Sequence, residues 1–293
     1  MIIVQIAGGL GNQMFQYATG RALAEKRKTE LKIDCWVMFN FYKLWPYELD
    51  KLKLKENFAE KNEVPYFNVP SKNIIFRTLK YVMRKNKITL KKYYFEEEFK
   101  FDPKLLEQPD GTYLHGAFQT EKYFKDIRHI LLREFEFKKK LDKKNEAIAK
   151  QMSECNSVSV HFRKGDYVSN KKNLSIFENC SINYYKKSVE FIAKKVKEPI
   201  FYVFSDDIDW VKKNFEIKHK TVFVHNPGKD SYKDMILMST CKHNIIANSS
   251  FGWWGAWLNK NPEKIVIAPK KWFVKTKAPD IIPEDWIKID NTS

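Results

Sequence analysis

Apolar and polar positions follow a regular pattern in the second half of the chain. Short apolar runs alternate with longer segments whose apolar residues recur every three or four positions, which predicts strands alternating with amphipathic helices. The predicted strands are 157–162, 200–204, 221–224, 243–247 and 264–268, and the predicted helices are 182–197, 208–215, 230–240 and 251–259. Ser181 is the expected cap of the first helix. This alternation favours a parallel sheet covered on both faces by helices.

The first half of the chain has fewer clear elements. Residues 2–7 alternate and predict a strand, which leads through a glycine-rich turn to Asn12 as the N-cap of a helix over about 13–28. A second strand is predicted within 111–119, and a helix over about 121–135 follows it.

Two further stretches bear on the domain organisation. Residues 35–110 are rich in aromatic residues and lysine without a regular period, so we predict only short helices there. The lysine-rich stretch 138–150 is the expected domain junction. A chain of 293 residues is long enough for two domains, and we place them at 1–148 and 149–293.

The composition narrows the class of protein. The chain carries 53 Lys and Arg against 36 Asp and Glu, a formal net charge of +17, which predicts a nucleic acid, an acidic membrane surface or a phosphorylated small molecule as partner. A hydrophobic fraction of 43% excludes a disordered chain. The four scattered cysteines favour reduced thiols over disulfides or a zinc site. Because signal-peptide and membrane-span patterns are absent from the sequence, we expect a cytoplasmic protein.

Polar and charged residues follow three of the predicted strands. In an open parallel sheet, ligands bind beyond the carboxyl ends of the strands, so these residues are candidates for one ligand site. They are His161, Arg163 and Asp166 at the end of the first strand, Ser205, Asp206 and Asp207 at the end of the second, and Asn248, Ser249, Ser250 and Phe251 at the end of the fourth.

The third group has the clearest binding chemistry. Ser250 as an N-cap leaves the first-turn amides and the positive end of the helix dipole at the sheet edge, where they can hold phosphate oxygens. Arg163 from a neighbouring strand would add a permanently charged, bidentate partner for a diphosphate. An ordinary serine cap is the alternative.

The acidic residues after the second strand allow two interpretations. Asp207 and Asp209 form a D-x-D pair that could bind a metal, yet at a helix start their side chains diverge by about 200°. We favour a carboxylate that accepts hydrogen bonds from the donor edge of guanine. Capping of the helix by Ser205 or Asp206 is compatible with that role.

The N-terminal glycine turn suits a different ligand. Met14 stands where the dinucleotide-binding motif has its third glycine, and the turn contains no phosphate-binding G-K-[ST] sequence. The amides of Asn12 and Gln13 can donate and accept hydrogen bonds together, which favours an uncharged polyhydroxy ligand.

Five segments of the chain resemble the bacterial α-1,2-fucosyltransferases of glycosyltransferase family 11. They are residues 8–18, 116–124, 161–167, 204–207 and 248–259, in the order expected for the family. The resemblance implies an α/β fold of the GT-B type, with two Rossmann-like domains, the donor site in the C-terminal domain and the active site in the cleft between them. Lys164 and Gly252 depart from the family pattern, since many relatives have Arg and Ser there.

The resemblance also implies a reaction and residue roles. L-Fucose would pass from GDP-β-L-fucose to the 2-hydroxyl of a terminal galactoside, with inversion and without a metal or other cofactor. The product would be an α-1,2 linkage on a bacterial oligosaccharide or glycolipid, as in lipopolysaccharide biosynthesis. Arg163 would hold the diphosphate and neutralise the departing GDP. His161 and one of Asp206 and Asp207 would read guanine. The β-phosphate would be bound by Ser249, Ser250 and Phe251.

The residues themselves agree with this class of mechanism. A leaving nucleoside diphosphate needs a metal or fixed positive groups, and the transition state resembles an oxocarbenium ion, as in glycoside hydrolysis. A general base would help to deprotonate the acceptor hydroxyl, and Asp166 and His115 are the candidates. The acceptor side would be lined by Gly9, Asn12, Gln13 and Gln119.

Three other functions stay open. A metal-dependent transferase of another nucleotide sugar would use Asp207 and Asp209. A nucleic-acid-binding protein would account for the charge, although zinc-finger spacing and an aromatic RNP strand are absent from the sequence. A non-catalytic module would only bind sugar. For the preferred function, the partners are GDP-fucose and a galactoside rather than nucleic acid, and the basic surface predicts peripheral docking at an anionic inner-membrane face.

Overall fold

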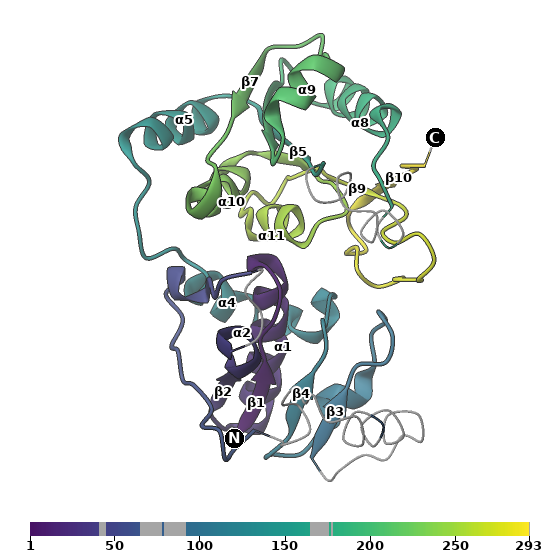
Figure 1. Ribbon diagram of the computed structural model, residues 1–293. Helices are drawn as coiled ribbons and strands as arrows, with labels where there is room; N and C mark the ends of the chain where they lie inside the picture. The colour runs from purple at the N-terminus through teal and green to yellow at the C-terminus, as the bar shows by residue number, and fades with distance from the viewer. Residues whose placement is uncertain (41–44, 65–77, 79–91, 165–175, 177, 293) are drawn as a thin grey trace. The chain divides into compact units, whose positions relative to one another are not determined.

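The computed structural model describes residues 1–40, 45–64, 78, 92–164, 176 and 178–292, and the chain divides into two units (Figure 1). Unit 1 comprises residues 1–138 with 279–281, and unit 2 comprises 139–278 with 282–293. The expected boundary after residue 148 therefore falls inside helix α5 (Lys143–Glu154), which belongs to unit 2. The observed boundary, between Lys138 and Lys139, lies at the start of the stretch 138–150 where the junction was expected. The rest of that stretch leads into α5, which Asp142 caps.

The sheet of unit 2 has the strand order of a doubly wound nucleotide-binding fold. Its strands are β5 (Ser157–Phe162), β6 (Ile200–Ser205), β7 (Thr221–Val224), β8 (His243–Ile245), β9 (Val266–Pro269) and β10 (Ile287–Ile289). They are parallel in the order β10-β9-β8-β5-β6-β7. Counted along the unit this is 3-2-1-4-5-6 read from the β7 edge, and the order reverses between β5 and β8. The parallel sheet was predicted from sequence, whereas β10 was not.

Helices connect these strands close to their predicted positions. They are α8 (Ile182–Lys195), α9 (Ile208–Asn214), the short turn η6 (Gly228–Asp230), α10 (Tyr232–Thr240) and α11 (Ser250–Leu258). Ser181 caps α8 as predicted, with its side chain accepting from the backbone N–H of Tyr184. In contrast, α11 begins one residue earlier than predicted, because Ser249 rather than Ser250 has the extended backbone of an N-cap.

Helix α11 is buried on nearly all sides, which fixes the position of its first turn. Trp253, Trp254 and Trp257 are each at most 2% exposed, and the ring centroids of the first two lie 4.9 Å apart. Gly255 allows close packing, since a Cβ there would lie 3.0 Å from Met238 on α10. A helix that is apolar all round belongs in a core. The N-terminal end of α11 is therefore held rigidly at the sheet edge.

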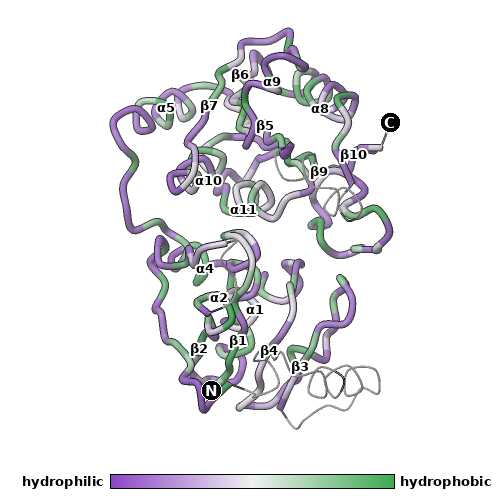
Figure 2. Tube along the Cα trace, in the orientation of Figure 1, coloured by the Kyte–Doolittle hydropathy of each residue, from purple (hydrophilic) through white to green (hydrophobic). Residues whose placement is uncertain are grey.

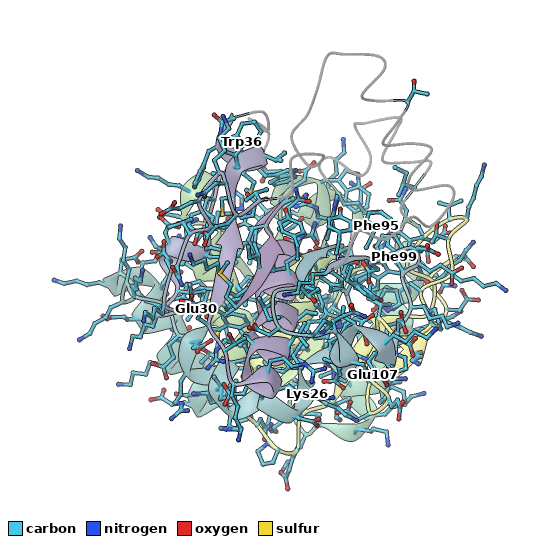
Figure 3. The ribbon with its side chains drawn as sticks, turned by 90° about the horizontal axis from the view of Figure 1, so that it is seen from below. Lys26, Glu30, Trp36, Phe95, Phe99 and Glu107 are labelled. Carbon is cyan, nitrogen blue, oxygen red and sulfur yellow. The ribbon has the colours of Figure 1, made fainter. Side chains whose placement is uncertain are left out.

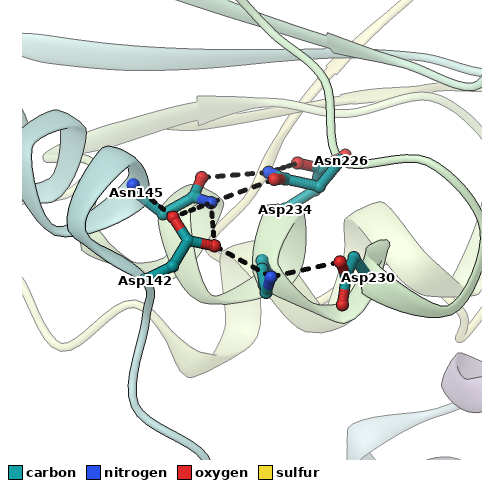
Figure 4. A network of polar contacts seen from close by, with 6 residues as sticks. Asp142, Asn145, Asn226, Asp230 and Asp234 are labelled. Carbon is teal, nitrogen blue, oxygen red and sulfur yellow. Dashed lines mark hydrogen bonds and ion pairs between the residues drawn. The ribbon is translucent and has the colours of Figure 1, made fainter.

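A polar network joins α5 to α10 and to the loop after β7 (Figure 4). The carboxylate of Asp142 accepts from the backbone N–H of Asn145 and from Lys233 Nζ at 2.8 Å. The Asn145 and Asn226 amides bond to each other in both directions at 3.0 Å, and Asn226 Nδ2 also donates to Asp234 Oδ1 at 2.7 Å. Burial raises the pKa of Asp234 to about 7.

Unit 1 contains a smaller parallel sheet. Its strands are β1 (Ile2–Gln5), β2 (Leu31–Asp34), β3 (Tyr93–Phe95) and β4 (Tyr113–His115), in the order β2-β1-β4-β3. Apolar residues concentrate on strands such as β1 (Figure 2). Figure 3 shows the side chains from below, with Phe95 at the end of β3. Strands β2 and β3 were not predicted, because each is short and lies among irregular aromatic and lysine residues.

The first helix of unit 1 starts earlier than the sequence suggested. Helix α1 (Leu10–Arg27) has Gly9 as its N-cap, and the Gly9 carbonyl accepts from the backbone N–H groups of Asn12 and Gln13. The prediction of Asn12 as the cap was wrong. Gly8 makes the earlier start possible, because its φ of +80° turns the chain directly into the helix.

The remaining elements of unit 1 are short. They are α2 (Trp36–Asn40), η1 (Leu49–Lys51), η3 (Pro103–Glu107), η4 (Glu121–Tyr123), η5 (Lys125–Ile127) and α4 (Arg128–Glu134). The single helix predicted over 121–135 is thus two tight turns followed by α4. The break occurs at Phe124, whose ψ of 5° departs from helical geometry. None of the helices in the described part of the chain combines the length and apolar character needed to span a membrane.

Candidate functional site

The three strand ends selected from the sequence lie side by side at one edge of the unit 2 sheet. Strand β5 pairs with β6 on one side, with Phe162 opposite Ser205, and with β8 on the other, with Val160 opposite Ile245. The loops after β5 and β8 leave the sheet at the point where the strand order reverses. In doubly wound sheets this is where ligands bind.

Arg163 is held by the carboxylate of Asp206. Its Nη1 lies 3.1 Å from Asp206 Oδ2, and the other oxygen of this carboxylate accepts from the backbone N–H of Lys164 at 2.8 Å. The two charged side chains are 22% and 24% exposed. A guanidinium carries its five N–H donors in a planar fork, and this ion pair orients the fork. The ion pair with Asp206 therefore fixes the orientation of the Arg163 guanidinium at the sheet edge.

His161 is buried beside the first turn of α11. It is 5% exposed, and its Nδ1 has no hydrogen-bond partner among the residues that the structure describes. Its ring lies 6.0 Å from that of Phe251, and a Cβ on Gly252 would come within 2.5 Å of Nδ1. The lack of a side chain at Gly252 therefore leaves the space that the imidazole ring occupies. Burial lowers the pKa of His161 to about 4, so the ring is neutral near pH 7.

Lys164, where many members of the resembled family have a second Arg, contacts neighbouring residues of unit 2. Its Nζ donates to the backbone carbonyl of Cys180 at 3.4 Å and lies 4.5 Å from the centre of the Trp210 ring. Burial lowers the pKa of its ammonium group. These contacts give Lys164 a packing role that supports the loop after β5.

The loop after β8 combines a helix start with two hydroxyls. Ser249 is 6% exposed and its side chain makes no capping hydrogen bond, and Ser250 opens α11. These are the groups expected to hold phosphate oxygens. Asn248 differs from them, because its Nδ2 donates to the carbonyls of Glu178 and, at 2.9 Å, Trp272. Its amide ties neighbouring loops together.

The loop after β6 forms local caps. Ser205 Oγ accepts from the backbone N–H of Asp207, whose carboxylate accepts in turn from the backbone N–H of Trp210, both at 3.0 Å. The N-cap of α9 is therefore Asp207, rather than Ser205 or Asp206 as the sequence suggested. Asp209 is 93% exposed and faces Lys212. No cluster of three His, Cys, Asp or Glu side chains with metal-ligand geometry occurs in the described part of the chain.

The predicted acceptor residues of unit 1 fall into two kinds. Gln13 is fully buried, with Nε2 donating to the carbonyls of Gly8 and Pro46 and Oε1 accepting from the backbone N–H of Glu48. Its amide therefore holds the loop that follows β1. In contrast, Asn12 is partly exposed, and its Oδ1 accepts from Gln119 Nε2 at 2.8 Å.

Gly9 and His115 are the other candidates of unit 1. Gly9 lies against Trp45, since a Cβ there would be 3.4 Å from the indole ring. His115 ends β4, and its Nδ1 is 2.6 Å from the Tyr93 hydroxyl. Asp166, the other candidate for the general base, lies outside the described residues. Its role stays a prediction.

Comparison with known proteins shows which family matches this chain. The sequence model described as Glycosyl transferase family 11 matches residues 1–290. An α-1,2-colitosyltransferase of Escherichia coli is 37% identical over 303 residues, which cover 99% of this chain and 99% of that protein. A galactoside α-(1,2)-fucosyltransferase 2 of Hylobates lar is 24% identical over 267 residues, covering 88% of this chain and 69% of that protein.

A solved structure has a similar fold. The fucosyltransferase NodZ from Bradyrhizobium aligns over 87% of this chain and 91% of its own, with a TM-score of 0.51 and 15% sequence identity. Together with the parallel sheets of both units, this likeness confirms the predicted α/β fold of the GT-B type.

Proposed function

The chain belongs to glycosyltransferase family 11, and from this premise we propose that it transfers L-fucose from GDP-β-L-fucose to the 2-hydroxyl of a terminal galactoside. The observation that carries the donor assignment is the placement of Arg163, fixed by Asp206, at the edge where Ser249 and Ser250 begin α11. An oriented guanidinium and a helix N-terminus are complementary to a diphosphate.

The proposed mechanism is a single displacement. The acceptor oxygen forms a bond to the anomeric carbon on the face opposite GDP, the bond to the β-phosphate oxygen breaks, and the configuration inverts. Arg163 and the first turn of α11 stabilise the negative charge that develops on the departing diphosphate. Fixed positive groups of this kind support a reaction without a metal. A base removes the proton of the acceptor hydroxyl, with Asp166 and His115 as the predicted candidates.

The base of the donor is the proposed partner of His161. A neutral imidazole with an unpartnered Nδ1 can accept a hydrogen bond from a ring N–H such as those of guanine. Asp206 and Asp207 were the predicted carboxylate partners for guanine. The ion pair of Asp206 with Arg163 and the cap formed by Asp207 favour other uses of these two groups.

Colitose is the second candidate for the transferred sugar. The observation that favours it is the 37% identity to an α-1,2-colitosyltransferase. Colitose is fucose without its 3-hydroxyl, so a site with a buried partner for that hydroxyl would discriminate between the two donors. The loss of one such hydrogen bond changes kcat/KM substantially, because the partner is left unpaired.

The test is an assay of the purified protein with GDP-fucose or GDP-colitose and a panel of β-galactosides, with and without excess EDTA. We expect higher kcat/KM for GDP-fucose, undiminished turnover in EDTA, and an α-1,2-linked product in the NMR spectrum. Higher kcat/KM for GDP-colitose would mean that the transferred sugar is colitose and not fucose. Loss of activity in EDTA would contradict the metal-independent mechanism, and a different linkage would contradict the proposed acceptor position.

We further propose that the basic surface docks the enzyme on an anionic inner-membrane face, where glycolipid acceptors are assembled. The support is the net charge of +17. Co-sedimentation with vesicles should increase with their content of anionic lipid and decrease with salt. Equal binding to neutral and anionic vesicles would contradict this proposal.

A further inference from the structure

A tight turn follows strand β4 in unit 1 and determines where Gln119 lies. The turn runs from Gly116 to Gln119, and Phe118 within it has a φ of +53°, a conformation that non-glycine residues adopt at an energetic cost. A Cβ on Gly116 would lie 2.5 Å from Glu96 and 2.7 Å from the Phe118 ring. Such a turn persists only where its surroundings hold it.

Glu96 is the residue that holds this turn. It follows β3, and its Oε2 accepts from the backbone N–H groups of Ala117 at 2.7 Å and Phe118 at 2.9 Å. The pKa of Glu96 is raised because burial outweighs these two hydrogen bonds, which by themselves would lower it. Two amides converging on one carboxylate oxygen are a strong, charge-assisted arrangement.

Helix α1 holds the same turn from the other side. Gln16 donates from Nε2 to the carbonyl of Gly116 at 3.1 Å, while its Oε1 accepts from the backbone N–H of Ala7 at 2.8 Å. The turn is therefore connected to β3 through Glu96 and to the loop after β1 through Gln16. Both connections fix the position of the turn and therefore of the Gln119 side chain at its end.

The outcome is a pair of amides at the carboxyl ends of β1 and β4. Gln119 Nε2 donates to Asn12 Oδ1 at 2.8 Å, whereas Gln119 Oε1 is buried and has no hydrogen-bond partner among the described residues. The Asn12 nitrogen remains as a donor, and Gly8 leaves room beside it, because a Cβ there would be only 2.8 Å away. Whichever way the two amides are oriented, the bonded pair presents one NH₂ group and one carbonyl oxygen.

We propose that Asn12 and Gln119 form a subsite for two neighbouring hydroxyls of the acceptor sugar, and that Glu96 is its positioning residue. The acceptor class rests on the proposed function. A sugar hydroxyl both donates and accepts, so one hydroxyl accepts from the amide nitrogen while its neighbour donates to the unpaired carbonyl oxygen. A neutral amide pair suits an uncharged galactoside. A buried oxygen without a partner is unfavourable, and a bound hydroxyl would supply the partner.

Steady-state kinetics with lactose as acceptor test the subsite. Asn12→Asp keeps the oxygen that accepts from Gln119 and removes the NH₂ group, so the KM for lactose should rise roughly tenfold, the equivalent of about 1.4 kcal/mol, while the KM for GDP-fucose stays unchanged. The matched control is Gln108→Glu, another amide-to-acid change in unit 1, where the amide donates to the Lys104 carbonyl; both KM values should stay at wild type. A rise confined to the KM for GDP-fucose in Asn12→Asp would overturn the proposal.

Glu96 is tested by two substitutions. Glu96→Ala should raise the KM for lactose with kcat largely retained, and Glu96→Gln should restore it, because its amide oxygen still accepts from the turn. The pH profile of kcat should be the same in Glu96→Gln and in the wild type. A large loss of kcat in Glu96→Gln with an altered profile would overturn the positioning role, since that is the signature of a general base.

A binding measurement separates this proposal from the proposed function. Saturation-transfer NMR of methyl β-D-galactoside needs neither donor nor turnover. Weaker binding in Asn12→Asp than in Gln108→Glu supports the subsite even if the wild type transfers no fucose. Equal binding to both variants overturns it even if the wild type is an active fucosyltransferase.

Discussion

Asp206 contacts two consecutive residues of the loop after β5 through the two oxygens of its carboxylate. One contact fixes the side chain of Arg163 and the other fixes the backbone at Lys164. From sequence, Asp206 was a candidate to read guanine, a role that nothing in its observed contacts requires. The proposed role of Arg163 and the position of Asp206 lead to two predictions at the scale of single residues.

Replacement of Arg163 should remove stabilisation of the departing diphosphate. We expect Arg163→Ala to lower kcat by at least about 100-fold, in the range for loss of one group that stabilises transition-state charge. Arg163→Lys should recover only part of this, because an ammonium lacks the planar fork of donors. Turnover is measured with GDP-fucose, and circular dichroism checks the fold. Turnover near that of the wild type in Arg163→Ala would refute the mechanism.

Asp206→Asn should act through Arg163. The amide oxygen can still accept from the backbone N–H of Lys164, but the charge that holds the guanidinium is lost, so kcat/KM should fall roughly tenfold, or about 1.4 kcal/mol. In a double-mutant cycle the substitution should have almost no further effect when Arg163 is already Ala. Additive losses in the double variant would instead mean that Asp206 contacts the donor independently, as a guanine-reading residue would.

At the scale of elements, sequence patterns predicted unit 2 well and unit 1 poorly. Strands β5 and β7 have their predicted bounds: the apolar run of β5 is buried throughout, whereas β7 lies at the edge of the sheet with only Val224 buried. Strand β3 has only three residues, and its partner β4 comes much later in the chain, so no local pattern marks it. Elements that depend on long-range pairing cannot be recognised from a window of sequence.

Sequence patterns likewise identified some residues of the candidate sites and missed others. His161, Arg163 and Ser249 could be selected because each lies at or just after the end of a regular strand. Glu96 was missed because its partners are backbone amides twenty-one and twenty-two residues later, and a backbone N–H has no sequence signature. The structural use of Gln13 was missed because its partners are also backbone groups, those of Gly8, Pro46 and Glu48.

The packing of α1 on the sheet of unit 1 gives a prediction about an element. A Cβ on Gly20 would lie 2.9 Å from both Leu31 Cδ1 and Val4 Cγ1. Gly20→Ala should therefore destabilise the protein by about 1–2 kcal/mol, because overpacking outweighs the gain in helix propensity. The comparison is Gly255→Ala, where the added Cβ would be 3.0 Å from Met238 Cβ and Cε; no contact is shorter than 3.0 Å and the flexible Cε end can move aside, so the loss should be smaller. Urea unfolding measures both, and an equal or smaller loss for Gly20→Ala would contradict this account of the contact.

At the scale of the whole molecule, stability should depend on pH through the network around Asp234. A carboxyl with a pKa of about 7 in the fold and an ordinary value near 4 in the unfolded chain binds more protons when folded between these two pH values. The free energy of unfolding therefore decreases as pH rises from about 4 to about 7, and this contribution is constant above that.

Asp234→Asn tests this dependence. The asparagine oxygen can still accept from Asn226 Nδ2, while the group no longer titrates. The difference in unfolding midpoint between the variant and the wild type should grow in favour of the variant from pH 5 to pH 7 and then level off. A constant difference across this range would show that Asp234 does not titrate as its burial implies.

Residues 279–281 have a consequence for how enzymes of this kind can be recombined. They come from the C-terminal part of the chain yet belong to unit 1, where Asp280 accepts from the backbone N–H of Phe101 and from Lys122. A hybrid gene joined once, after residue 138, would give the N-terminal half of one parent the Asp280 region of the other. A hybrid made to exchange donor preference between relatives should therefore take residues 279–281 from the same parent as residues 1–138.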